Sequence, residues 1–103
     1  MPDAAFAAHL FRRGEFTLNV RLPTPLVDYT QGERDVEATG ETLDGLLRDL
    51  DRQYPGIRFR MIDEQDTVRA HIKLFVNGEL ERSLGTCLTD QDNIIIVAAL
   101  SGG

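Results

Sequence analysis

One segment of this chain has a clear helical pattern, and it constrains the fold more than any other feature. Between residues 41 and 56, apolar side chains recur at steps of three and four residues and so share one side of an α-helix. These side chains are Leu43, Leu46, Leu47, Leu50 and Tyr54. Thr42 is placed to cap the helix, Asp44 suits its first turn, and Pro55 ends it. Gly45 is unusual in a helix interior and is expected to mark close packing against a sheet.

The other patterned segments predict strands that form this sheet. Residues 16–22 alternate between apolar and polar until two prolines end the pattern, and residues 33–39 alternate more weakly. Residues 71–81 contain Asn-Gly, the pair favoured in a two-residue hairpin turn, and residues 93–99 are apolar on both faces, which favours a central strand or a partner-binding face. The order strand, strand, helix, strand, short strand, strand predicts an α+β protein with the β-grasp, or ubiquitin-like, fold: a mixed sheet covered on one face by a single main helix.

The length of the chain predicts one domain. Its 103 residues are sufficient for one hydrophobic core. Residues 1–14 are expected to form a flexible N-terminal extension, because termini are poorly ordered unless they dock, and residues 15–103 to form the β-grasp domain with its Gly-Gly tail. No segment is apolar for long enough to be a secretory leader or to cross a bilayer, and a single cysteine excludes an intramolecular disulfide. These features predict a cytoplasmic protein.

The charge balance limits the class of partner. The formal net charge is −6, whereas nucleic acids and anionic membranes select cationic surfaces. We therefore expect neither as a partner and expect a basic partner surface instead.

The residue types that often carry chemistry lack the context they would need. Cys87 has no second cysteine or histidine beside it and is interpreted as a small buried thiol. His9 and His71 have no metal-ligand spacing, and Asp90 and Asp92 lack the rest of a calcium loop and are expected to shape a turn. Nucleotide-binding and nucleophile-elbow motifs are also missing from the sequence. We expect a non-catalytic protein without a metal or a bound cofactor.

Several short motifs give the chain a family resemblance. From about Phe16 to Gly103 it resembles the small sulfur-carrier proteins of the MoaD and ThiS type, which are ubiquitin-like and end in Gly-Gly. The resemblance rests on VRLPTPL after the first strand, QYPGI at the end of the helix, FVNGEL in the hairpin, LTDQDN before the last strand, and the terminal Gly-Gly. It is strongest to the MoaD-like branch that includes the carrier of the O-phosphoserine-dependent cysteine pathway. Ala98 and Ala99 stand where many members carry proline.

The resemblance implies a chemical role for the tail. The α-carboxylate of Gly103 would be adenylated by a ubiquitin-activating-type adenylyltransferase, which consumes ATP, and converted to a thiocarboxylate that donates sulfur. An α-carboxyl group with a pKa of about 3.3 to 3.7 is ionised at neutral pH, so it needs no base from this chain to attack a phosphate. Gly102 and Gly103 have no Cβ, which lets the backbone pass through a narrow channel.

Strand parity predicts a partner-binding surface. Phe75 lies on the opposite side of its strand from the residues expected in the core, and the last strand carries a second apolar set on one face. The residues expected to bind the activating enzyme and the sulfur acceptor are Phe75, Ile95, Val97, Leu100 and Ser101. The alternative is that the charged connection at 58–69, or the N-terminal extension, covers this face.

Three functions remain open from the sequence. As a sulfur carrier, the chain would donate sulfur to one of three acceptors: the large subunit of molybdopterin synthase, a pyridoxal-phosphate cysteine synthase, or a thiazole or other metabolite synthase. In the first case the chain would itself be the small subunit of molybdopterin synthase. As a protein modifier, it would be joined through Gly103 to a lysine of a target. As a plain β-grasp interaction module, it would have no use for its tail.

Overall fold

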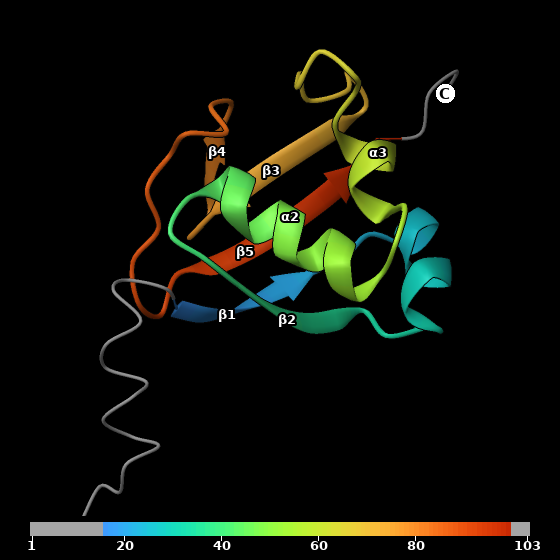
Figure 1. Cartoon of the computed structure of the whole chain (residues 1–103), viewed down its shortest axis with the longest axis horizontal. Coiled ribbons are helices and arrows are strands. Elements are labelled where there is room, and N and C mark those ends of the chain that lie inside the picture. Colours follow the sequence, from blue (N-terminus) through green and yellow to red (C-terminus); the bar gives the residue numbers. More distant parts are fainter. Residues whose placement is uncertain (1–15, 100–103) are drawn as a thin grey trace, which may run out of the picture.

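Five strands form a mixed sheet in the order β2-β1-β5-β3-β4 (Figure 1). The computed structural model describes residues 16–99. The strands are β1 (Phe16–Arg21), β2 (Asp35–Gly40), β3 (Ile72–Val76), β4 (Glu79–Glu81) and β5 (Asn93–Ala98). Between them lie the 3-10 helix η1 (Thr24–Thr30) and the α-helices α2 (Leu43–Gln53) and α3 (Ile57–Met61). The predicted order of strands and main helix is confirmed.

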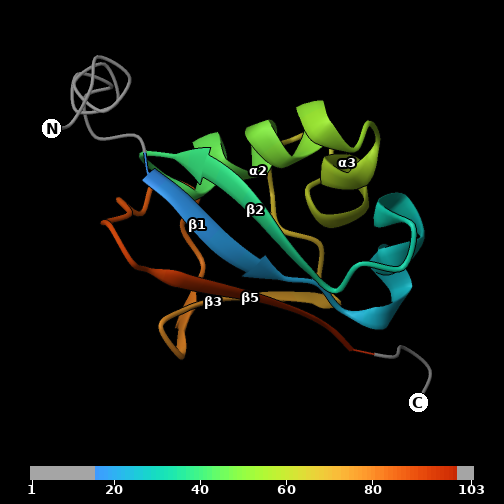
Figure 2. The ribbon, with the colours of Figure 1, turned by 90° about the horizontal axis from the view of Figure 1, so that it is seen from below.

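The C-terminal strand occupies the middle of the sheet. β5 runs parallel to β1, with Val20 beside Ile94, and antiparallel to β3, with Leu74 beside Ile96. Its last residue, Ala98, lies opposite Ile72 at the start of β3. The described chain therefore ends at the central strand of the sheet, as Figure 2 shows.

Helix α2 covers one face of the sheet, as its pattern predicts. The Thr42 hydroxyl oxygen accepts a hydrogen bond from the Gly45 N–H at 3.1 Å, and all four leucines of the helix are fully buried. They pack on side chains from four strands, whose removal from water stabilises the fold. This core includes Leu18, Val20, Leu22, Val36, Ala38, Leu43, Leu46, Leu47, Leu50, Ile72, Leu74, Ile94 and Ile96.

The close approach of helix and sheet is at Gly40 rather than at Gly45. A Cβ on Gly40 would collide with the backbone nitrogen of Leu46 and would lie 2.8 Å from the carbonyl carbon of Gly45. A Cβ on Gly45 would meet nothing nearer than the Thr42 hydroxyl oxygen, at 3.5 Å. The prediction of close packing here is confirmed, but β2 supplies the glycine that it requires.

Two short helices were not expected. Pro25, in the first turn of η1, fits a helix start as well as the end of a strand. Most of helix α3 was expected to belong to the charged connection at 58–69, and this expectation is corrected. Ile57 and Met61, four residues apart, are both fully buried, so α3 packs on the same side of the sheet as α2 (Figure 2).

The hairpin between β3 and β4 has the predicted two-residue turn. Asn77 and Gly78 have φ values of 52° and 87°, which are the positive values of the predicted hairpin turn. In the part of the chain that the structure describes, no helix combines the length and the apolar character needed to span a bilayer.

Candidate functional site

The site predicted from the sequence has two parts, and the structure describes one of them. Leu100, Ser101, Gly102 and Gly103 lie outside the described residues. The structure does describe the end of β5, from which these residues continue, and the sheet face beside it.

The predicted binding residues of β3 and β5 meet on the sheet face opposite α2. Phe75 and Ile95 are paired across the two strands and are half-buried, and Val97 is 39% exposed. In Figure 2 both α-helices lie on the other side of the sheet, and no described element covers this face. The alternative that the 58–69 connection covers Phe75 is therefore wrong, because α3 lies on the helix side. Residues 1–14 lie outside the described part.

Sequence reasoning missed one member of this face. Leu80 of β4 lies directly opposite Phe75 and is 39% exposed. The predicted two-residue turn fixes this register, so counting back from Asn-Gly would have found it. We call Phe75, Leu80, Ile95 and Val97 the apolar sheet face.

A hollow joins the apolar sheet face to the end of β5. Its volume is about 530 Å³, and its lining includes Ile95, Val97 and Ala98 on one side and Pro23 and Pro25 on the other. Its rim carries two arginines. The first, Arg21, pairs with the Asp35 carboxylate at 3.7 Å.

The second arginine of this rim is bonded to neutral oxygens. Arg34 donates hydrogen bonds to the Leu22 carbonyl oxygen at 3.2 Å and to the Thr24 hydroxyl oxygen at 3.1 Å. The loop between β1 and β2 therefore holds this guanidinium in place without neutralising it.

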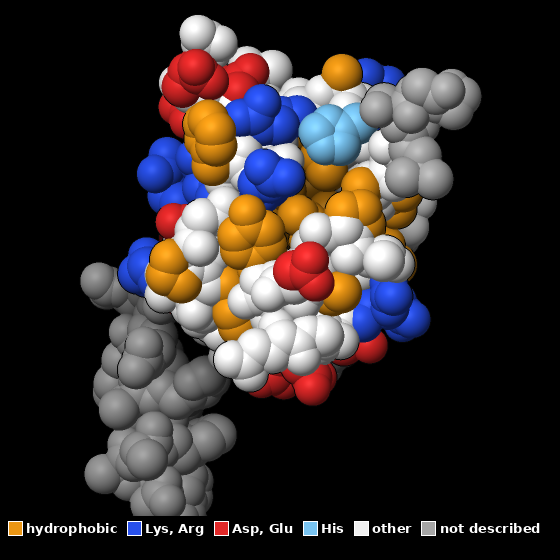
Figure 3. All heavy atoms as spheres, turned by 90° about the vertical axis from the view of Figure 1, so that its right-hand side faces the viewer, with side chains coloured by type: hydrophobic (Ala, Val, Ile, Leu, Met, Phe, Trp, Pro, Cys, Tyr) orange, Lys and Arg blue, Asp and Glu red, His pale blue; other side chains and the backbone are white. Residues whose placement is uncertain are grey.

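A second hollow lies on the other side of the end of β5. Its volume is about 330 Å³, and Phe59, Arg60, Arg69 and His71 are in its lining. The Arg69 Nε donates a hydrogen bond to the Phe59 carbonyl oxygen at 2.8 Å, and its guanidinium carbon lies 4.5 Å from the centroid of the Phe59 ring. This stacking keeps the charged group against an exposed aromatic ring. Figure 3 shows this end of the molecule, where basic and histidine side chains border an apolar area.

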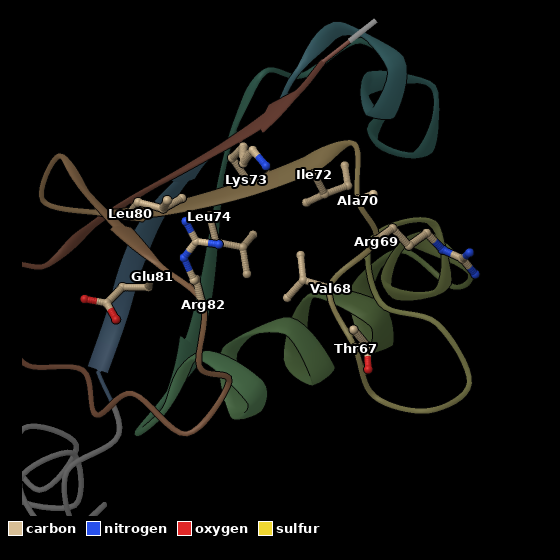
Figure 4. Close-up of a pocket in the computed structure, with 10 residues that line it drawn as sticks. All are labelled: Thr67, Val68, Arg69, Ala70, Ile72, Lys73, Leu74, Leu80, Glu81 and Arg82. Atoms are coloured by element: carbon tan, nitrogen blue, oxygen red, sulfur yellow. The ribbon is translucent and has the colours of Figure 1, made fainter. Parts of the chain in front are cut away.

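A third hollow lies along the outer edge of β3 (Figure 4). Its volume is about 250 Å³, and Val68 points toward Ile72 and Leu74 there, whereas Lys73 points to the opposite side of the strand. This alternation confirms the parity that places Phe75 on the apolar sheet face.

Comparison with known proteins identifies the family. Residues 20–103 match the ThiS family. The chain belongs to this family. The sulfur carrier protein CysO of Mycobacterium tuberculosis is 34% identical over 91 residues, which cover 84% of this chain and 98% of the relative.

Solved structures place this ThiS-family chain among β-grasp proteins, and the predicted fold is confirmed. The crystal structure of Mycobacterium tuberculosis CysO has a TM-score of 0.77 and 32% identity, and the match covers 81% of this chain and 99% of that one. A chain in the crystal structure of the BexX/CysO complex of Amycolatopsis orientalis has a TM-score of 0.77 and 31% identity, and the match covers 84% of this chain and 99% of that one. The solution structure of the small archaeal modifier protein 1 of Methanosarcina acetivorans has a TM-score of 0.73 and 26% identity, and the match covers 86% of this chain and 98% of that one.

The remaining candidates of this ThiS-family chain have structural or surface positions. Asp92 shapes a turn as predicted, because the Thr89 N–H donates to its carboxylate at 2.7 Å, and this hydrogen bond, with others from Thr89 and Asn77, lowers the pKa of Asp92. His71 is exposed. The buried-thiol interpretation of Cys87 is wrong: the residue is exposed, and the neighbouring Leu88 enters the core instead. Among residues 16–99, no three His, Cys, Asp or Glu side chains are grouped to hold a metal ion.

Proposed function

We propose that this chain is a sulfur carrier whose reactive group is the Gly103 carboxylate. The observation that carries the proposal is the family match, which continues through residue 103, combined with a sheet whose central strand is the last described element before the Gly-Gly segment in the sequence. A carrier needs a stable body and a reactive end that reaches outward. A core built within residues 18–96 supplies the first.

The proposed cycle has two chemical steps. A carboxylate oxygen of Gly103 attacks the α-phosphate of ATP on the adenylyltransferase, and pyrophosphate leaves. A sulfur nucleophile then attacks the acyl carbon, AMP leaves, and a thiocarboxylate remains. ATP and the catalytic groups belong to the partner enzyme, so the carrier itself is non-catalytic and needs no bound cofactor. A cytoplasmic location, where thiols stay reduced, suits this chemistry.

The apolar sheet face is the proposed docking surface for the adenylyltransferase and the sulfur acceptor. Burial of Phe75 and Val97 against a partner would place the end of β5 at the mouth of that partner's active site. Leu100 and Ser101 would then enter the channel ahead of the body. A large aromatic residue with branched aliphatic neighbours is a typical centre for a protein interface.

The similarity to CysO favours the cysteine-synthase branch of acceptors over molybdopterin synthase. A second candidate function is protein modification through Gly103, which the match to a small archaeal modifier protein supports. The two differ in outcome, because a carrier ends its cycle unattached and a modifier ends it joined to a target.

The deciding experiment is an intact-mass measurement. The purified chain is incubated with ATP, a sulfide source and the adenylyltransferase of its host. We expect a gain equal to the exchange of one oxygen for sulfur, confined to the C-terminal peptide and absent when Gly103 is deleted. Denaturing gels of host extract give the second readout: ladders of conjugates with no mass gain would assign the modifier function instead.

A further inference from the structure

The exit of the tail is surrounded by arginines. The two hollows beside β5 share Pro25 and Ala98, so they flank the point where the described chain ends. Arg34 borders one hollow, and Arg60 and Arg69 border the other. We call Arg34, Arg60 and Arg69 the basic collar.

The collar differs from most other arginines of the body in having no carboxylate partner. Arg21, Arg48, Arg52 and Arg58 each pair with an aspartate. Within the described part of the chain, no carboxylate pairs with a collar arginine, and neither hollow has an acidic side chain in its lining. Three arginines without a carboxylate partner among residues 16–99 thus lie beside the end of β5, in a chain whose net charge is −6.

The length of the C-terminal segment determines which part of a partner the collar can contact. The five residues from Ala99 to Gly103 span at most about 18 Å when extended, at about 3.3 to 3.6 Å per residue. A nucleotide at the Gly103 carboxylate would then lie far from the collar, beyond the range of direct hydrogen bonds. The surface that meets the collar is the protein surface around the opening that takes the tail.

We propose that the basic collar binds an acidic rim around the tail channel of the adenylyltransferase. This inference rests on the proposed function. An acidic rim attracts the collar and repels the acidic remainder of the carrier, so the carrier approaches with its tail foremost. Such long-range attraction raises the rate of association and weakens as salt screens it.

The test compares two variants that lose the same charge. Arg60→Gln/Arg69→Gln removes two collar cations, and Arg48→Gln/Arg52→Gln removes two cations from the exposed side of α2. The adenylyltransferase is assayed by ATP–pyrophosphate exchange with each carrier at about 0.05 M and about 0.5 M salt, which spans strong and weak screening. We expect the collar variant to raise KM roughly five- to tenfold at low salt, with kcat unchanged and little difference at high salt. The α2 variant should change KM less than about twofold.

Two further measurements separate charge from structure. Arg69→Lys keeps the charge but loses the planar group that stacks on Phe59, and it should retain near-normal KM. Circular dichroism melting of all variants checks that they are folded. Equal KM for the collar and α2 variants at low salt, or a rise in KM of the collar variant that is as large at high salt as at low salt, would overturn the proposal.

The basic collar can also be tested if the proposed function fails. If the wild-type chain supports no exchange, the carrier proposal fails, and the collar is then judged by NMR titration with hexaglutamate at low salt. Shifts of the backbone amide signals of residues 60 and 69, present in the wild type and absent in the collar variant, would support an acidic protein partner. No shift, or tighter binding of a short single-stranded oligonucleotide than of hexaglutamate, would overturn it.

Discussion

Asp49 joins helix α2 to the outermost strand β2. Its carboxylate accepts hydrogen bonds from the Thr39 N–H at 3.0 Å and from the Gln53 amide at 3.0 Å, and it pairs with Arg52 at 2.9 Å. Gln53 in turn donates to the Glu37 carbonyl oxygen at 2.9 Å. Outward-facing backbone groups of an edge strand are thus occupied by helix side chains, which protects the edge from pairing with another chain.

Replacing Asp49 by Asn should destabilise the protein in a pH-dependent way. Burial alone would raise the pKa of Asp49, but the hydrogen bonds from Thr39, Gln53 and Arg52 outweigh it and lower the pKa. A lowered folded-state pKa adds stability that is present above the unfolded value of about 3.9 and is lost as pH falls through the folded value. We expect Asp49→Asn to lose about 1 to 2 kcal/mol at neutral pH, with the difference narrowing below about pH 4.

Urea unfolding at several pH values would measure this difference. Glu64→Gln, at an exposed position, is the control and should change stability by less than about 0.5 kcal/mol. A gap between Asp49→Asn and wild type that stayed constant down to pH 2 would contradict the role assigned to the ionised carboxylate.

Gly40 and Gly45 should respond to alanine in opposite directions. At Gly40 the new Cβ meets helix backbone, which cannot rotate aside, so Gly40→Ala should cost about 3 kcal/mol. At Gly45 the space is free and the residue is helical, so Gly45→Ala should stabilise by up to about 1 kcal/mol. Thermal melting of the two variants checks both signs, and a stabilised Gly40→Ala would mean that α2 does not approach β2 this closely.

At the scale of elements, β3 and β5 contribute both to the core and to the apolar sheet face. Alternate residues of each strand enter the core, and Phe75, Ile95 and Val97 lie on the opposite face, so one pair of strands carries the fold and the proposed docking surface. Substitutions at the outward positions of these strands should therefore affect partner binding more than stability.

Phe75→Ala should weaken partner binding more than folding. Loss of a central aromatic residue from an interface commonly costs 2 kcal/mol or more, so we expect KM for adenylation to rise roughly tenfold or more. Leu80→Ala, at the margin, should have a smaller effect. Val68→Ala truncates a residue of the third hollow and serves as the control. If Phe75→Ala and Val68→Ala gave the same KM, the apolar sheet face would not be the docking surface.

Elements with a repeated pattern were predictable, and short ones were not. Five strands and α2 follow from alternation, from the leucine spacing and from Asn-Gly. Helix α3 has five residues and only two buried positions, too few to distinguish a helix from a strand. The buried thiol was wrong because residue type alone does not say which neighbour, Cys87 or Leu88, points inward. The collar depends on three distant segments that only the tertiary fold brings together.

The whole molecule combines a negative net charge with arginines beside the end of β5. The net charge of −6 led us to expect a basic partner, yet the end that carries the tail presents unpaired arginines. The net charge sets the interaction of the whole carrier with a distant partner, whereas the basic collar sets the local charge that the partner meets beside the end of β5.

Removing the Gly-Gly segment should leave the body intact. Among residues 16–99 no fully buried side chain lies beyond Ile96, so we expect that deletion of Gly102 and Gly103 does not expose the core. We expect an unchanged Tm in calorimetry together with complete loss of the thiocarboxylate mass gain. A decrease of more than about 4 °C, equivalent to about 1 kcal/mol, would show that the tail contributes to folding.

The central position of β5 also determines how the protein responds to force. A pull on the tail, away from the strand's own start, loads the hydrogen bonds to β1 and β3 in shear, because β5 lies between both strands. Bonds loaded in shear must break together, whereas an edge strand pulled sideways unzips one pair at a time. The sheet should therefore withstand a larger pull at the C-terminal end of β5 than a sideways pull on an edge strand.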